Sequence, residues 1–148
     1  MRTKILIAVL IVGCIIACKK NVYNSKPTIV LKSISSNLIP VNGNLTIELQ
    51  VFDKEGDVTD PATLSLIKLR LNQKVVTDLV NNDTLSKKIP SAPLSQDGFI
   101  QMTLDYTNFL VSAVSRDEND TIQYKFALTD QAGNVSDTIL TEPIVIIR

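Results

Sequence analysis

The chain has 148 residues, of which 45% are hydrophobic and 20% charged, and it contains 15 basic side chains, 15 acidic side chains and no histidine. Without histidine, Ser-His-Asp catalysis, Cys-His catalysis and the usual zinc sites are excluded. The basic residues are scattered, so no basic stripe of the kind that binds nucleic acid is present.

The N-terminal segment has the pattern of an export signal. Two positive charges precede an unbroken apolar stretch of 13 residues, Ile5 to Ala17, which Lys19 and Lys20 end. As a helix this stretch would span about 20 Å, whereas the hydrocarbon core of a bilayer is about 30 Å thick. The pattern therefore predicts a signal peptide over residues 1–17 rather than an uncleaved anchor or a buried helix.

Ile15-Ile16-Ala17-Cys18 resembles the bacterial lipobox, in which aliphatic and small residues precede a cysteine that receives lipid. Ile11-Val12-Gly13-Cys14 fits the same pattern four residues earlier. We prefer Cys18 because it lies at the border between apolar and polar residues, whereas cleavage before Cys14 would leave three apolar residues exposed. The resemblance implies cleavage before Cys18 and a lipidated N-terminus, followed by a polar tether over residues 18–27.

The sequence Cys-Lys-Lys-Asn from Cys18 onward resembles the N-termini of small lipoproteins of the Bacteroidota. This resemblance implies a lipid anchor in the cell envelope. Lys19 stands where the enterobacterial inner-membrane retention signal has Asp, which favours the outer membrane. Whether the domain faces the periplasm or the outside is left open by the sequence. The implied partners are the membrane and an envelope protein, with no nucleic acid and no identifiable small-molecule substrate.

Removal of residues 1–17 would leave about 130 residues with 13 basic and 15 acidic side chains, a net charge of about −2. That length suits one domain, predicted over residues 28–148. Both cysteines lie before this domain, so it contains no disulfide.

Short segments of alternating or β-rich character, separated by turn residues, predict an all-β domain. In one of them, Ile67, Leu69 and Leu71 alternate with Lys68 and Arg70, so the apolar side chains are expected on the buried face. Helical spacing of apolar residues predicts a short crossover helix over Thr107–Ser115. The candidate strands are Thr28–Ile34, Leu45–Val51, Ile67–Leu71, Val75–Leu79, Thr84–Ile89, Ile100–Leu104, Ile122–Leu128, Ser136–Leu140 and Ile144–Ile147.

Val75–Leu79 and Thr84–Ile89 are the shorter and weaker candidates. Seven or eight short strands in about 120 residues predict an antiparallel β-sandwich. Two turns, Phe52–Asp57 and Asp130–Ser136, resemble turns of bacterial immunoglobulin-like and fibronectin-like domains. The resemblance implies an immunoglobulin-like β-sandwich of the disulfide-free kind, because the Cys-Trp-Cys pattern of antibody domains is missing from the sequence.

Two acidic segments, Asp53–Asp60 and Asp117–Asp120, place oxygen-bearing side chains at the close spacing that calcium loops use. The segment from Asp53 is not an EF-hand loop, because its twelfth position is Leu64 rather than Glu. The segment from Asp117 resembles part of a cadherin calcium motif, although Thr121 replaces an Asn of that motif. The alternative is that these are ordinary turn residues. The candidate calcium ligands are Asp53, Glu55, Asp57, Asp60, Asp117 and Asp120.

Three Asp-Thr-aliphatic tripeptides resemble the O-glycosylation acceptor of the Bacteroidota, with Thr84, Thr121 and Thr138 as the acceptors. The alternative is that an Asp closing a turn, followed by a Thr starting a strand, produces the same tripeptide.

These patterns favour a membrane-anchored envelope lipoprotein whose β-sandwich is a non-enzymatic binding or structural module. No set of catalytic residues and no cofactor other than calcium is predicted. The alternatives are a calcium-stabilised, cadherin-like adhesion module and, as a second alternative, an enzyme that uses a pair of carboxylates.

Overall fold

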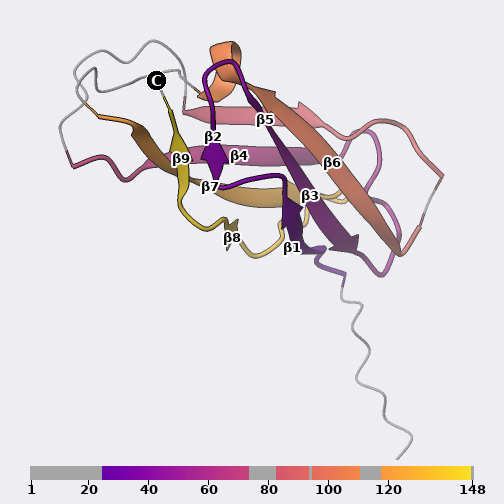
Figure 1. The fold of residues 1–148 in the computed structure, drawn as a ribbon. Coiled ribbons are helices and arrows are strands. Elements are labelled where there is room, and N and C mark those ends of the chain that lie inside the picture. Colours follow the sequence, from indigo (N-terminus) through magenta and orange to yellow (C-terminus); the bar gives the residue numbers. More distant parts are fainter. Residues whose placement is uncertain (1–24, 74–82, 94, 111–117, 148) are drawn as a thin grey trace, which may run out of the picture.

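The structure is a computed structural model that describes residues 25–73, 83–93, 95–110 and 118–147 (Figure 1). The predicted signal peptide with Cys14 and Cys18, the predicted strand Val75–Leu79 and the candidate ligand Asp117 lie outside the described residues. No helix among the described residues is both long enough and apolar enough to span a membrane.

Nine strands and one π-helical turn make up the described part of the chain. In chain order they are β1 (Thr28–Ile34), β2 (Leu38–Ile39), β3 (Asn44–Phe52), β4 (Thr63–Arg70), β5 (Thr84–Lys88), β6 (Asp97–Asp105), η1 (Tyr106–Leu110), β7 (Asp120–Thr129), β8 (Ile139–Leu140) and β9 (Ile144–Ile146).

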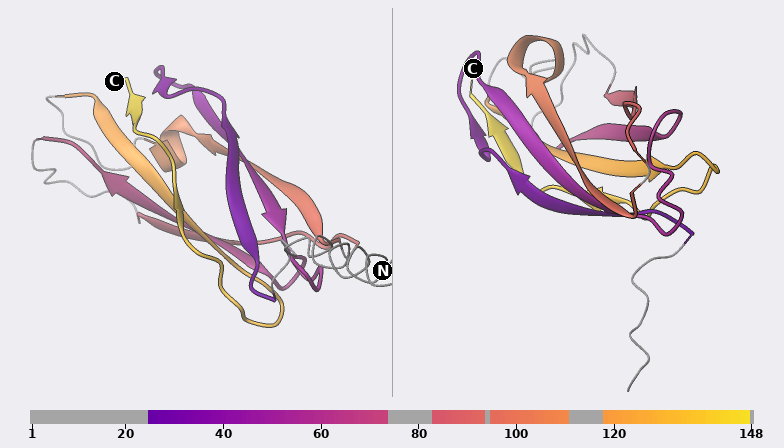
Figure 2. Two further views of the ribbon diagram at one scale, coloured as in Figure 1. Left: turned by 90° about the horizontal axis from the view of Figure 1, so that it is seen from below. Right: turned by 90° about the vertical axis from the view of Figure 1, so that its right-hand side faces the viewer.

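The strands form two sheets that face each other (Figures 1 and 2). One sheet has the order β1-β3-β6 and the other the order β2-β9-β7-β4-β5, with β8 paired to β7. All pairs are antiparallel except β2 and β9. This arrangement is an immunoglobulin-like β-sandwich, so the predicted fold class is confirmed.

Two long strands, one from each sheet, contribute more buried residues to the core than any other element. In β3 and in β7, buried and half-buried residues alternate along the whole strand, because successive side chains of a strand point to opposite faces. The fully buried side chains include Leu45, Ile47 and Leu49 from β3 and Phe126 and Leu128 from β7. The core therefore lies between the two sheets and fixes their relative position.

The buried face of β4 is opposite to the predicted one. Leu64, Leu66 and Lys68 are buried, whereas Ile67 is exposed and Leu71 lies beyond the strand, also exposed. The strand begins at Thr63, so Leu64 and Leu66 set which positions point inward, and the alternation then carries Lys68 to the core side.

Other predicted elements differ in extent. The predicted strand Ser136–Leu140 is reduced to β8, and β2 is a strand that the sequence pattern did not indicate. The predicted helix Thr107–Ser115 corresponds to the single turn η1 in its described part.

The two ends of the sandwich are defined by the strand register. At one end, here called the tether end, Thr28 of β1 pairs with Phe52 of β3, so the chain enters the domain there (Figure 1). At the other, the far end, Asp120 of β7 pairs with Ile146 of β9.

Candidate metal centre

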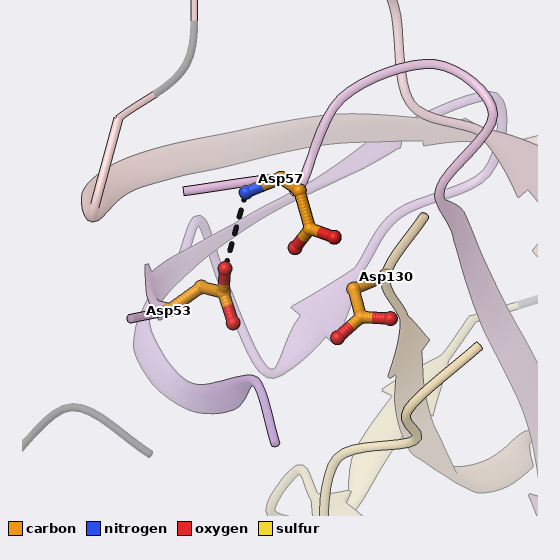
Figure 3. Close-up of side chains that lie close together, drawn as sticks. All are labelled: Asp53, Asp57 and Asp130. Carbon is orange, nitrogen blue, oxygen red and sulfur yellow. Dashed lines mark hydrogen bonds between the residues drawn. The ribbon is translucent and has the colours of Figure 1, made fainter. Parts of the chain in front are cut away.

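Three aspartates from separate parts of the chain meet at the tether end (Figure 3). Asp53 directly follows β3, Asp57 lies four residues further on, and Asp130 directly follows β7. One carboxylate oxygen from each lies within 4.8 Å of the corresponding oxygens of the other two. Because β3 and β7 belong to different sheets, the cluster joins the two layers of the sandwich.

Asp53 is held by the loop that it opens. Its side chain is only 1% exposed, and its Oδ2 accepts a hydrogen bond of 3.1 Å from the backbone N–H of Asp57. Its own backbone N–H donates to the carbonyl of Gln96 at 2.8 Å. Gly56 has a φ of 70°, a conformation that glycine adopts without strain, and this turn brings Asp57 back over Asp53.

Asp130 is fixed by the turn that follows β7. The residue is 4% exposed. Its Oδ1 accepts from the backbone N–H of Asn134 at 2.8 Å, and its Oδ2 accepts from the Asn134 side-chain amide at 2.9 Å. The side-chain amide of Gln131 donates to the carbonyl of Asp60 at 3.0 Å, so the turn is also bound to the loop that carries Asp57.

The hydrogen bonds to this cluster leave two of its carboxylate oxygens without a partner among the described residues. Oδ1 of Asp53 and Oδ1 of Asp57 are buried and accept no hydrogen bond from the described residues. The ion pairs among the described residues, Lys26 with Asp137 and Arg70 with Asp83, both lie outside the cluster. Three effects raise the pKa of Asp57 above its ordinary value of 3.8. The largest is burial, followed by the interaction of its side chain with that of Asp53 and by the charge of Asp130.

The structure brings together only part of the predicted ligand set. Asp53 and Asp57 lie in the cluster, whereas Glu55 and Asp60 are exposed and outside it. Asp120 is the first residue of β7 and lies at the far end, about 30 Å along the strand from Asp130 at about 3.3 Å per residue. The two acidic segments of the sequence therefore do not form one site.

Asp130 is a member of the cluster that the sequence analysis did not include among the ligands. The turn from Asp130 to Ser136 was interpreted only as a structural motif. The signal that could have found it is the position of two acidic turns, one after β3 and one after β7, at strand ends that an immunoglobulin-like sandwich places on the same side.

The three predicted acceptor threonines lie in different surroundings. Thr84 opens β5 and Thr138 directly precedes β8, and both are exposed. Thr121 is half-buried within β7 and pairs with Val145 of β9. Glycosylation at these positions stays a prediction.

A groove with a volume of about 360 Å³ lies between the start of β6 and the segment that precedes it. Val58, Ile89, Pro93 and Phe99 contribute apolar walls, and Phe99 is 60% exposed. Asp97 is the only ionisable residue among those that line the groove. A single carboxylate does not provide the pair that carboxylate-based hydrolysis requires.

No protein-family model and no curated protein matches the sequence. Among solved structures, the major pilin subunit BcpA of Bacillus cereus matches with 13% identity and a TM-score of 0.43, over 82% of this chain and 40% of the pilin. A sporulation control protein from Bacillus subtilis matches with 12% identity and a TM-score of 0.39, over 84% of this chain and 51% of that protein. The chain thus corresponds to about half or less of each of these proteins.

Proposed function

We propose that this protein is a lipid-anchored lipoprotein of the outer membrane, and that its β-sandwich is a non-enzymatic binding or structural module. The observation that carries the proposal is the lipobox Ile15-Ile16-Ala17-Cys18, placed a short distance before the first strand at Thr28. The lipid on Cys18 and on the amine freed by cleavage would hold the chain stably, because two or more acyl chains anchor a protein where one does so only marginally.

The proposed anchor places the domain close to the membrane. Residues 18–27 would form the tether, and ten residues reach at most about 35 Å when fully extended. The tether enters the sandwich at β1, so the tether end would face the membrane and the far end would face away from it. A partner in the envelope would therefore meet the far end or the sides of the sandwich.

The chemistry of the described residues supports a module rather than an enzyme. The sequence has no histidine, and its two cysteines precede the domain. The groove beside β6 holds a single carboxylate. The acidic cluster contains three carboxylates, the oxygen ligands that calcium binds in proteins.

The anchor is tested by replacing Cys18. The Cys18→Ala variant should move from the detergent phase to the aqueous phase in a detergent phase-partition experiment, and it should no longer incorporate labelled palmitate. Cys14→Ala is the matched control, since it removes the other lipobox cysteine, and it should keep both the label and the detergent partition.

Two outcomes would contradict parts of this proposal. Continued labelling of Cys18→Ala together with loss of label in Cys14→Ala would move the anchor to Cys14. An unlabelled wild-type protein that partitions into the aqueous phase would overturn the lipoprotein assignment.

A further inference from the structure

We propose that Asp53, Asp57 and Asp130 bind one calcium ion, which joins the two sheets at the tether end. This inference concerns the folded domain and does not depend on the lipid anchor. It rests on the arrangement of three carboxylates (Figure 3) and on a buried oxygen that nothing else in the described structure satisfies.

Without an ion, the three ionised carboxylates would repel one another. Like charges within 4.8 Å of each other repel strongly where bulk water is excluded, and three pairs of this kind are present. Buried charges in proteins are paired, coordinate a metal or take up a proton. No described ion pair reaches this cluster, which leaves a cation or protons to compensate the charge.

One buried carboxylate oxygen of Asp53 lacks a hydrogen-bond partner among the described residues. Asp53 is 1% exposed, and its Oδ1 accepts no hydrogen bond although its Oδ2 does. An acceptor buried without a partner destabilises the folded state, and it does so more strongly when it is charged. The carboxylates of Asp53, Asp57 and Asp130 face a common space (Figure 3), so an ion placed there would supply the missing partner of Asp53 Oδ1.

The separation of the three carboxylate oxygens is compatible with one bound ion. Calcium binds carboxylate oxygens at about 2.3–2.6 Å, so opposite ligands stand up to about 5 Å apart. Three oxygens within 4.8 Å of one another are therefore close enough to bind one calcium ion. Magnesium demands near-ideal octahedral geometry and loses its water reluctantly, whereas calcium accepts irregular sets of carboxylate oxygens. The ligand set thus suits calcium, with water completing its roughly 6–8 ligands.

The proposed ion would act as a clamp between segments that are distant in sequence. Asp53 and Asp57 belong to the loop between β3 and β4, and Asp130 belongs to the turn after β7. Gln131 already links these two segments. Its side-chain amide donates to the carbonyls of Asp60 at 3.0 Å and Thr59 at 3.5 Å, and its backbone N–H donates to the carbonyl of Asp57 at 3.4 Å. Calcium would add ionic contacts between the same two segments, and would bind the folded state only, because the unfolded chain does not bring them together.

The test uses the full chain, purified in detergent and stripped of metal with a chelator, with thermal unfolding followed by circular dichroism. Addition of free calcium from about 0.1 to 10 mM, the range in which extracellular modules bind, should raise the Tm progressively, by about 5 °C or more at the top of the range. The same concentrations of magnesium should produce a clearly smaller rise.

Charge-removing variants separate binding from folding. Asp57→Asn should abolish most of the calcium-dependent rise and, in chelator, should unfold at the same temperature as the wild type or higher, because one repelling charge is gone. Asp130→Asn should also abolish the rise. Asp97→Asn is the matched control, since Asp97 is an exposed aspartate at the start of β6, and it should keep the full response.

The proposal is overturned if the wild-type Tm does not change up to 10 mM free calcium, which would leave protons as the compensation for the cluster. It is also overturned if Asp57→Asn and Asp97→Asn respond to calcium equally, since the ion would then bind elsewhere. An equal response to magnesium would overturn the assignment of calcium as the ion.

Discussion

Lys68 is a buried basic residue on a strand of the core. It lies on the core side of β4 and is 7% exposed, opposite Tyr124 of β7, whose hydroxyl is buried. Its ammonium group donates to the backbone carbonyl of Phe109. Burial lowers the pKa of Lys68 from 10.5 to about 8, against an opposing effect of the charges of Asp83 and Asp120.

This pKa makes stability depend on pH in a defined direction. Between pH 8 and 10.5 the unfolded state binds more protons than the folded state at Lys68, so stability rises with pH through this window and is lost as pH falls through it. The full difference between the two pKa values corresponds to about 3 kcal/mol. Lys68→Met removes the titration, so the stability of the wild type relative to this variant should increase by about that amount between pH 7 and 10.5.

Urea unfolding of both proteins at a series of pH values measures this difference, and the comparison cancels the other groups that titrate in the same range. A difference that stays constant from pH 7 to 10.5 would show that Lys68 is solvated in the folded state and would contradict its burial.

At the scale of the elements, turns at the tether end depend on glycines with positive φ. Gly56 has a φ of 70°, and a Cβ atom added to it would stand 3.1 Å from the backbone of Ser95. Gly133 has a φ of 87°, but an added Cβ would meet nothing within 4 Å. A side chain at either position would therefore strain the backbone, but only at Gly56 would it also be crowded by a neighbour.

We expect Gly133→Ala to lower the free energy of unfolding by about 1 kcal/mol, the cost of a left-handed conformation for a residue with a Cβ. Gly56→Ala should cost about 2 kcal/mol or more, since the crowding at Ser95 adds to that strain. Gly98→Ala is the control, because Gly98 has open space and no positive φ, and it should be close to neutral. Urea unfolding gives the three values, and equal losses at Gly56 and Gly133 would contradict the role of Ser95.

Individual elements differ in how well the sequence predicts them. Strands with an unbroken alternation, such as β3 and β7, were predicted almost to their ends, because period-two burial is visible in the sequence. The buried face of β4 was not, since its apolar residues occupy both faces and only the start of the strand at Thr63 decides between them. Two of the three aspartates of the acidic cluster, Asp53 and Asp57, are visible as local spacing. Asp130 is not, because its proximity follows from the packing of one sheet on the other.

At the scale of the whole molecule, the core is continuous across both sheets and includes residues from Ile29 in β1 to Ile146 in β9. Cys14 and Cys18 both precede this part of the chain. A soluble fragment that begins at Ser25 should therefore fold without the tether, with a β-type circular dichroism spectrum and a single cooperative transition.

Reductant should leave the Tm of this fragment unchanged, since it has no thiol. A spectrum dominated by helix, or a fragment that unfolds without a cooperative transition, would contradict an independently folding sandwich.

The parallel pairing of β2 and β9 has a mechanical consequence. The backbone N–H groups of Val145 and Ile147 donate to the carbonyls of Asn37 and Ile39, and both strands run toward the far end. A force applied between the residues that precede β1 and the end of β9 would draw β2 toward the tether end and β9 toward the far end. The hydrogen bonds between β2 and β9 would then be loaded together in shear rather than broken one at a time.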